Sequence, residues 1–247
     1  MTSRPGDLPY YNGTPVRIGG GGWMLVLAAV IVAFLQLALW QPESIPLAYL
    51  SALLLPVLPV VALMAATGWR APAVFRPVGF RGALIALGFA LLTILCSFAA
   101  GALLARIMPM TSNPNLAGIA DEGTAELLIF LGRAGIQLVG EELVTILPLL
   151  AVLWVCVERL KLSRVWALAI AVTVSTVWFA ALHLPTYDWN WVQCLGTIGT
   201  ARIVLTLAYL VTRNLWVSSI AHIANDWSLF FVAFVGGHAP VGTEAFL

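Results

Sequence analysis

The chain has 247 residues, of which 61% are hydrophobic and only 9% are charged, and its formal net charge is +1. A soluble domain carries about 25% charged residues because its surface faces water, so this composition excludes a soluble globular protein and predicts lipid as the solvent. The near-neutral charge also excludes the basic footprint of a protein that binds nucleic acid.

Seven apolar segments are long enough to cross a bilayer, which takes about 20 mostly apolar residues in a helix. They follow a Gly- and Pro-rich stretch, residues 1–22, that we expect to be a flexible polar tail. The fourth segment is too long for one straight crossing, so it fits either one steeply tilted helix or an amphipathic helix followed by a span. We therefore predict an all-α, polytopic transmembrane helix bundle of seven or eight helices. The expected spans are 23–40, 45–67, 80–107, 125–157, 163–184, 192–212 and 214–235.

The cations fall between alternate spans, which indicates how the chain is oriented. With a cytoplasmic N-terminus, the inside segments hold Arg4, Arg17, Arg70, Arg76, Arg81, Arg159, Lys161, Arg164 and Arg213. The outside segments then hold Glu43, Asp121, Glu122, Asp188 and Glu244, with Arg106 nearby. The positive-inside rule therefore predicts a cytoplasmic N-terminus. We expect a multi-pass protein of the plasma membrane of a prokaryotic cell.

Ionisable residues inside the spans are confined to the second half of the chain. On insertion scales each costs about 2.5–3.5 kcal/mol at mid-helix, so such residues face the bundle interior and mark functional sites. The asymmetry predicts accessory helices over 23–110, a catalytic core over 124–236 and a C-terminal tail over 237–247. The intramembrane residues are Arg133, Glu141, Glu142, His183, Arg202, His222 and Asp226.

Helical spacing places these residues on shared faces. His222, Asn225 and Asp226 stand at i, i+3 and i+4, and Phe179 and His183 are four residues apart. We expect these faces to meet in a polar pocket within the last four spans. A third polar face runs along the fourth span at steps of four residues: Arg133, Gln137, Glu141 and Thr145.

The residue types in this pocket suit the activation of water. A carboxylate in a pocket of low dielectric constant can act as a general base, and a nearby histidine can orient the water or protonate the departing amine. A second histidine, with a carboxamide or carboxylate, can hold the oxyanion that develops. Glu141, His183 and His222, with Asn225 or Asp226, supply these groups without a serine or cysteine nucleophile.

Three motifs in this region resemble the CAAX protease and bacteriocin-processing (CPBP) family of intramembrane proteases, also called type II CAAX prenyl endopeptidase-like. The family pattern is Glu-Glu-x-x-x-Arg, then Phe-x-x-x-His, then His-x-x-x-Asn/Asp. Residues 141–146 read Glu-Glu-Leu-Val-Thr-Ile, residues 179–183 read Phe-Ala-Ala-Leu-His, and residues 222–226 read His-Ile-Ala-Asn-Asp. The order and spacing match, each motif lies on its own expected span, and the resemblance covers about residues 125–235.

The resemblance implies a role for each matched residue. Glu141 would activate water with help from His183, while Glu142 would be a supporting carboxylate. His222 and Asp226 would stabilise the oxyanion, with Asn225 as a less well-spaced candidate. We expect Phe179 to form a wall of the substrate pocket.

One position departs from the family pattern, because Ile146 stands where the arginine is expected. Either Arg133 or Arg202 could neutralise the glutamates from elsewhere, or activity could be altered or lost. We favour Arg202, which lies mid-span and otherwise has no partner.

Several alternatives stay open from the sequence. We expect no required cofactor; two histidines and two carboxylates would suit zinc, which remains the alternative, although no His-Glu-x-x-His helix is present. The leading hypothesis is an endopeptidase that cleaves near the C-terminus or membrane boundary of a membrane-associated peptide or protein in the lipid bilayer. The others are a family member that acts as an immunity or scaffold protein, and a proton-coupled transporter.

Overall fold

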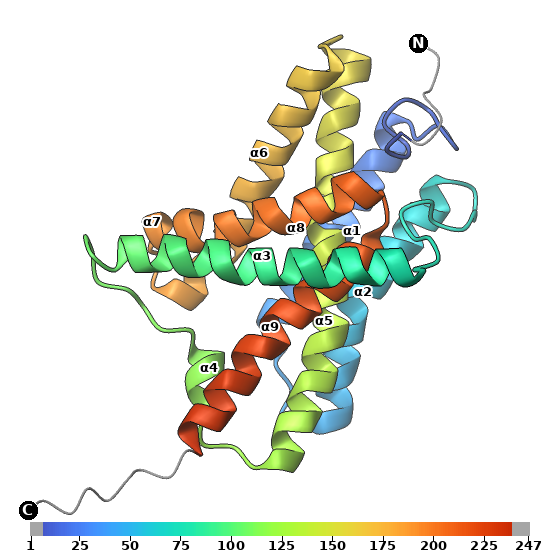
Figure 1. Cartoon of the computed structure of the whole chain (residues 1–247). Helices are drawn as coiled ribbons and strands as arrows, with labels where there is room; N and C mark the ends of the chain where they lie inside the picture. Colours follow the sequence, from blue (N-terminus) through green and yellow to red (C-terminus); the bar gives the residue numbers. More distant parts are fainter. Residues whose placement is uncertain (1–6, 239–247) are drawn as a thin grey trace, which may run out of the picture.

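The computed structural model describes residues 7–238, and this part of the chain is helical without a β-strand (Figure 1). Seven helices are long and apolar enough to cross a membrane, which confirms an all-α polytopic bundle and decides for seven spans within the described residues. Five spans are single helices: α1 (Gly20–Leu39), α2 (Ile45–Ala66), α3 (Phe80–Leu104), α6 (Arg164–Leu182) and α9 (Leu215–Gly237). The fourth span, Thr124–Arg159, joins α5 (Thr124–Trp154) to η1 (Val155–Arg159), and the sixth, Trp191–Thr212, joins α7 (Trp191–Gln193), η3 (Cys194–Ile198) and α8 (Gly199–Thr212). Two short helices lie between spans: α4 (Pro114–Ile119) and η2 (Leu184–Tyr187).

Helix α5 is the long central helix of the fold. It contacts α1, α2, α6 and α9, and at 1.5 Å per residue its 31 residues extend about 46 Å. The fourth expected span is therefore one continuous helix that η1 extends, rather than an amphipathic helix followed by a span. All residues from 142 to 151 are buried, whereas much of the stretch before them is partly or fully exposed.

A proline interrupts the hydrogen bonding of α5 just beyond the candidate site. Pro148 lacks an N–H, so the carbonyl of Val144, four residues earlier, loses its helical donor. The indole Nε1–H of Trp178, on α6, donates to that carbonyl at 3.1 Å. Helix α6 thus satisfies the group that Pro148 leaves open and is held against α5.

The turn between α8 and α9 places two site helices side by side. Arg213 ends α8 in the left-handed conformation, with φ of 54°, and Asn214 caps α9 by accepting a hydrogen bond from the N–H of Trp216 at 3.1 Å. The same Asn214 side chain bonds the backbone of Arg76 in both directions, at 3.1 and 2.9 Å. This tight turn fixes the register between α8 and α9.

The segment before α1 is packed rather than free, which corrects the expectation of a flexible tail for residues 7–18. Tyr10, Tyr11 and Ile18 are buried. The hydroxyl of Tyr10 accepts a hydrogen bond from the N–H of Ala73 at 2.6 Å, and Asp7 pairs with Arg164 at 2.6 Å. Aromatic side chains in this stretch supply apolar area that a polar, Gly-rich composition conceals.

The helices do not stand parallel to one another. Helices α3 and α8 pack together and run across the direction of α5, and α9 descends obliquely beside it (Figure 1). Depths counted along straight, parallel helices would place His222 far from Glu141. The oblique packing removes that difficulty and brings the two residues together.

Candidate active site

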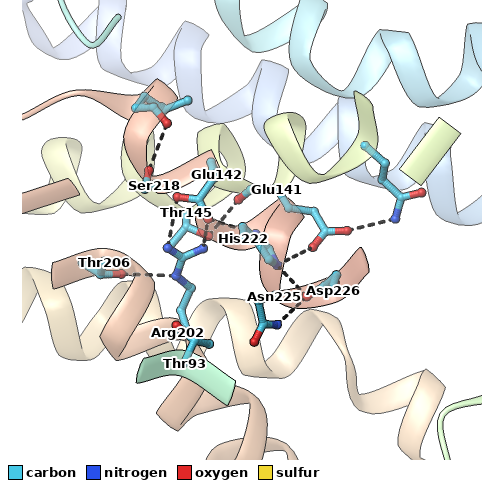
Figure 2. Close-up of polar contacts among 12 residues, drawn as sticks. Thr93, Glu141, Glu142, Thr145, Arg202, Thr206, Ser218, His222, Asn225 and Asp226 are labelled. Carbon is cyan, nitrogen blue, oxygen red and sulfur yellow. Dashed lines mark hydrogen bonds and ion pairs between the residues drawn. The ribbon is translucent and has the colours of Figure 1, made fainter. Parts of the chain in front are cut away.

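A fully buried ion pair joins α5 to α8 at the centre of the site (Figure 2). The guanidinium of Arg202 meets both carboxylate oxygens of Glu142, with Nη1 to Oε1 at 2.6 Å and Nη2 to Oε2 at 3.1 Å. Its Nε–H donates to the hydroxyl of Thr206 at 3.2 Å. Both charged side chains are 0% exposed. The cation missing at Ile146 is thus supplied from another helix, by the arginine favoured from the sequence.

His222, on α9, links this ion pair to the second glutamate. Its Nδ1 lies 3.0 Å from Oε1 of Glu142, and since that carboxylate is paired with Arg202, the ring nitrogen is the donor. The other ring nitrogen, Nε2, lies 4.0 Å from Oε2 of Glu141 and 3.8 Å from Oδ1 of Asp226. The buried carboxylate of Glu142 therefore holds the histidine, whose second ring nitrogen faces the carboxylates of Glu141 and Asp226.

Glu141 faces a cavity, unlike its neighbour in the sequence. Its side chain is 17% exposed, and Oε1 accepts a hydrogen bond from Nε2 of Gln137 at 2.9 Å. Thr145, on the same polar face, is buried, and its hydroxyl donates to the backbone carbonyl of Glu141 at 2.9 Å. The remaining oxygen of Glu141 is directed towards His222 (Figure 2).

Asp226 and Asn225 differ in their access to this cavity. Asp226 lines it and keeps 25% of its side chain exposed. Asn225 is buried; its Nδ2–H donates to Oδ1 of Asp226 at 2.7 Å, while its own Oδ1 has no hydrogen-bond partner among the described residues. Asn225 thus orients Asp226, which is the residue that reaches the cavity.

His183 ends α6 on the wall of the same cavity. Its Nδ1 lies 2.9 Å from the carbonyl oxygen of Phe179, which fixes Nδ1 as the donor and leaves Nε2 as an acceptor in the neutral ring. The centroid of the Phe179 ring lies 4.7 Å from that of the His183 ring and 6.3 Å from that of the His222 ring. The guanidinium carbon of Arg202 lies 5.2 Å from the same centroid, over the face of the ring. Phe179 therefore separates the cavity from the buried ion pair.

The cavity has a volume of about 520 Å³ and draws its walls from both halves of the chain. Helices α1 and α2 contribute Leu37, Ser51 and Leu55, and Trp40 follows α1 directly, so the N-terminal helices expected to be accessory form part of the pocket. Other lining residues lie in α4 and η2 and in the α1–α2 connection.

Arg133 lines the cavity but lies apart from the two glutamates. It was considered as a second compensating cation, but it forms no salt bridge with any described residue. Eight residues separate it from Glu141, which is about 12 Å along a helix, too far for a direct ion pair with the glutamates. It lines the cavity and its guanidinium carbon lies 5.6 Å from the Phe130 ring.

The positions of the possible metal-ligating side chains can be compared directly. In residues 7–238 no three side chains of the types His, Cys, Asp and Glu are gathered closely enough to hold one. The Nδ1 of His222 is engaged by Glu142, and its Nε2 contacts two carboxylates at 3.8 and 4.0 Å. Both distances are longer than a hydrogen bond, so the ring and these carboxylates interact through their charges when the ring is protonated.

Two features of the site were missed from the sequence. Thr206 lies one turn after Arg202, and that i+4 spacing could have identified it as the partner of the guanidinium. The cavity wall formed by α1 and α2 carried no such signal, because its residues are apolar or small and resemble lipid-facing positions.

Comparison with protein families identifies a match in the C-terminal part of the chain. Residues 123–228 match the family model of Type II CAAX prenyl endopeptidase Rce1-like proteins, a family of peptidases. This confirms the resemblance drawn from the three motifs, all of which lie inside the matched segment. No curated protein and no solved structure matches the chain.

Proposed function

We propose that this multi-pass membrane protein, whose residues 123–228 form an Rce1-like domain, is an intramembrane endopeptidase. It hydrolyses a peptide bond near the C-terminus or membrane boundary of a membrane-associated protein or peptide. The observation that carries the proposal is the position of Glu141, whose carboxylate lies on the cavity wall 4.0 Å from His222.

In this reaction Glu141 removes a proton from water, and the resulting hydroxide attacks the carbonyl carbon of the scissile bond. Gln137 holds one carboxylate oxygen, so the other is left to meet the water. The C–N bond then breaks, and the amine leaves with the proton that passes through Glu141 or His183. The free Nε2 of His183 on the same cavity wall suits this proton transfer.

In its doubly protonated form, the His222 ring stabilises the oxyanion. Three carboxylates and one guanidinium surround the ring, so a proton on His222 reduces the excess negative charge in a site of low dielectric constant. The imidazolium donates Nδ1–H to Glu142 and offers Nε2–H to the cavity. The protein supplies every proton donor and acceptor of the reaction, and we propose a glutamate-type rather than a metal-dependent peptidase.

The test is Glu141→Gln, which keeps the size of the side chain and removes its basicity. Peptides from membranes of cells with the wild-type protein are compared with those from cells with the variant. We expect a C-terminal fragment that depends on Glu141, with its rate of release lowered about 10²- to 10⁴-fold in the variant. Folding and membrane insertion are expected to be unchanged, because the side chain faces the cavity.

Glu126→Gln is the matched control, since this glutamate lies exposed in the first turn of the same helix. It should leave processing unchanged. Equal fragment patterns for wild type and Glu141→Gln would reject the peptidase and favour a scaffold role, and a pH-gradient-dependent flux in liposomes would indicate transport. Activity abolished by a chelator and restored by zinc would reject the glutamate-type mechanism.

A further inference from the structure

Two glycines of α5 lie in close contact with side chains of α2. A Cβ atom at Gly140 would lie 2.6 Å from Cγ, 2.8 Å from Cδ2 and 2.9 Å from Cβ of Leu55. A Cβ atom at Gly132 would lie 2.5 Å from the hydroxyl oxygen of Tyr49, which donates to the carbonyl oxygen of Ile129 at 2.9 Å. At both points the two helices approach to a distance that requires glycine.

These two contacts enclose the part of α5 that lines the cavity. Gly132 and Gly140 are eight residues apart, which is about 12 Å along the helix. Gln137 lies between them and Glu141 directly follows the second, and both line the cavity. The facing wall comes from one face of α2: Ala48, Ser51, Ala52 and Leu55. The separation of α2 from α5 therefore sets the width of the cavity beside Glu141.

The contact at Gly140 coincides with the part of α2 that has lost hydrogen bonds of its own. Pro56 and Pro59 follow Leu55 inside the helix, and neither has an N–H to donate to the preceding turn. This part of α2 thus depends on neighbouring helices for its position. Leu55 is buried, and its side chain packs against Gly140.

We propose that Leu55 is a positioning residue, which packs on Gly140 and thereby fixes the direction of the Glu141 carboxylate. This rests on the proposed peptidase function and adds a role in it for α2. Glu141 has few contacts of its own: Gln137 holds one oxygen, and the other lies 4.0 Å from His222. A misplacement of about 1 Å can lower a rate about 10²-fold, so the support that α2 gives to the backbone of α5 matters for catalysis.

Gly140→Ala tests the contact by adding one methyl group beside Glu141. The close atoms include Cβ of Leu55, which no side-chain rotation can move, so the added group forces α2 away from α5. Alanine favours an α-helix more than glycine does, so α5 itself is not weakened. We expect kcat to fall about 10- to 100-fold and KM to change less than about threefold. The assay uses full-length protein in phosphatidylcholine liposomes and a synthetic peptide that spans the Glu141-dependent cleavage site.

A second substitution distinguishes this positioning role from a general loss of structure. Leu55→Ala removes two of the three close atoms, so in the Gly140→Ala background it should raise kcat about fivefold or more. Gly88→Ala is the matched control, because a Cβ atom at this exposed glycine of α3 would have no atom within 4 Å, and it should behave as wild type. Wild-type kcat in Gly140→Ala overturns the proposal, as does the absence of any recovery in the double variant.

A labelling measurement separates the proposal from the proposed peptidase. Glu141→Cys is made in a background in which serine replaces the three native cysteines, and its alkylation by methyl methanethiosulfonate is timed. Withdrawal of α2 widens the cavity, so Gly140→Ala should raise the alkylation rate about threefold or more, and Gly88→Ala should leave it unchanged. If wild type cleaves nothing but this rise is found, only the peptidase fails. An unchanged rate in Gly140→Ala rejects the positioning role whether or not hydrolysis occurs.

Discussion

The two parts of α5, before and after the junction between Glu141 and Glu142, differ in whether their polar groups face a cavity or are buried and paired. Before the division, Arg133 and Glu141 face a cavity and retain unengaged donors or acceptors. After it, every residue to 151 is buried, and the polar groups are matched: Glu142 binds Arg202 and His222, and the Val144 carbonyl binds Trp178. The two adjacent glutamates therefore differ: Glu142 joins helices, and Glu141 lines the cavity.

Burial, rather than residue type, therefore separates the polar groups that join the helices from those that face the cavity. A buried polar group without a partner costs free energy, so Glu142 and the Val144 carbonyl bind donors from other helices, and the Thr145 hydroxyl donates within α5. In the first half, the polar side chains of Arg133, Gln137 and Glu141 line the cavity instead. Variants of the two halves should accordingly affect stability and activity separately.

Arg202→Ala should have the largest effect on stability. It leaves Glu142 as an uncompensated buried charge, which costs about 3–5 kcal/mol. Thermal unfolding in detergent micelles measures the loss. Glu142→Leu combined with Arg202→Met removes both charges and should recover much of the stability without restoring activity, because His222 loses its partner. A fully stable and active Arg202→Ala would contradict the assigned pairing.

Trp178→Phe should have an intermediate effect. It removes the only donor to the Val144 carbonyl found among the described residues and should lower the free energy of unfolding by about 1–3 kcal/mol. In a Pro148→Ala background the new N–H at residue 148 can satisfy that carbonyl, so the same change should cost less. Unfolding of the four proteins of this double-mutant cycle checks the prediction, and equal costs in both backgrounds would refute it.

Asp7→Asn should have the smallest effect, because the pair of Asp7 with Arg164 lies at the water boundary. Burial opposes ionisation of Asp7, but hydrogen bonds from Arg164, Tyr11 and the Leu8 N–H outweigh it and lower its pKa. Its stabilisation is therefore present above the unfolded pKa of about 3.9 and is lost as pH falls through the lower folded pKa.

The size of that stabilisation is at most about 1 kcal/mol, since the Arg164 side chain is 46% exposed and water screens the pair. Unfolding of wild type and Asp7→Asn is compared at neutral and acidic pH. We expect the difference between them to shrink in acid. A difference as large as that of Arg202→Ala would show that exposure does not separate the two ion pairs.

The membrane class, the bounds of the apolar segments to within a few residues and the residues that gather at the site could be predicted from the sequence, which left seven or eight helices open. Apolar length and helical period are local properties, and charges inside spans are too costly to be incidental. The pairing of Arg202 with Glu142, the exposure of Glu141 rather than Glu142 to the cavity, and the wall formed by α1 and α2 became visible in the folded structure alone. Those outcomes depend on how the helices cross, which is set by packing between residues distant in the chain and leaves no pattern within any one span.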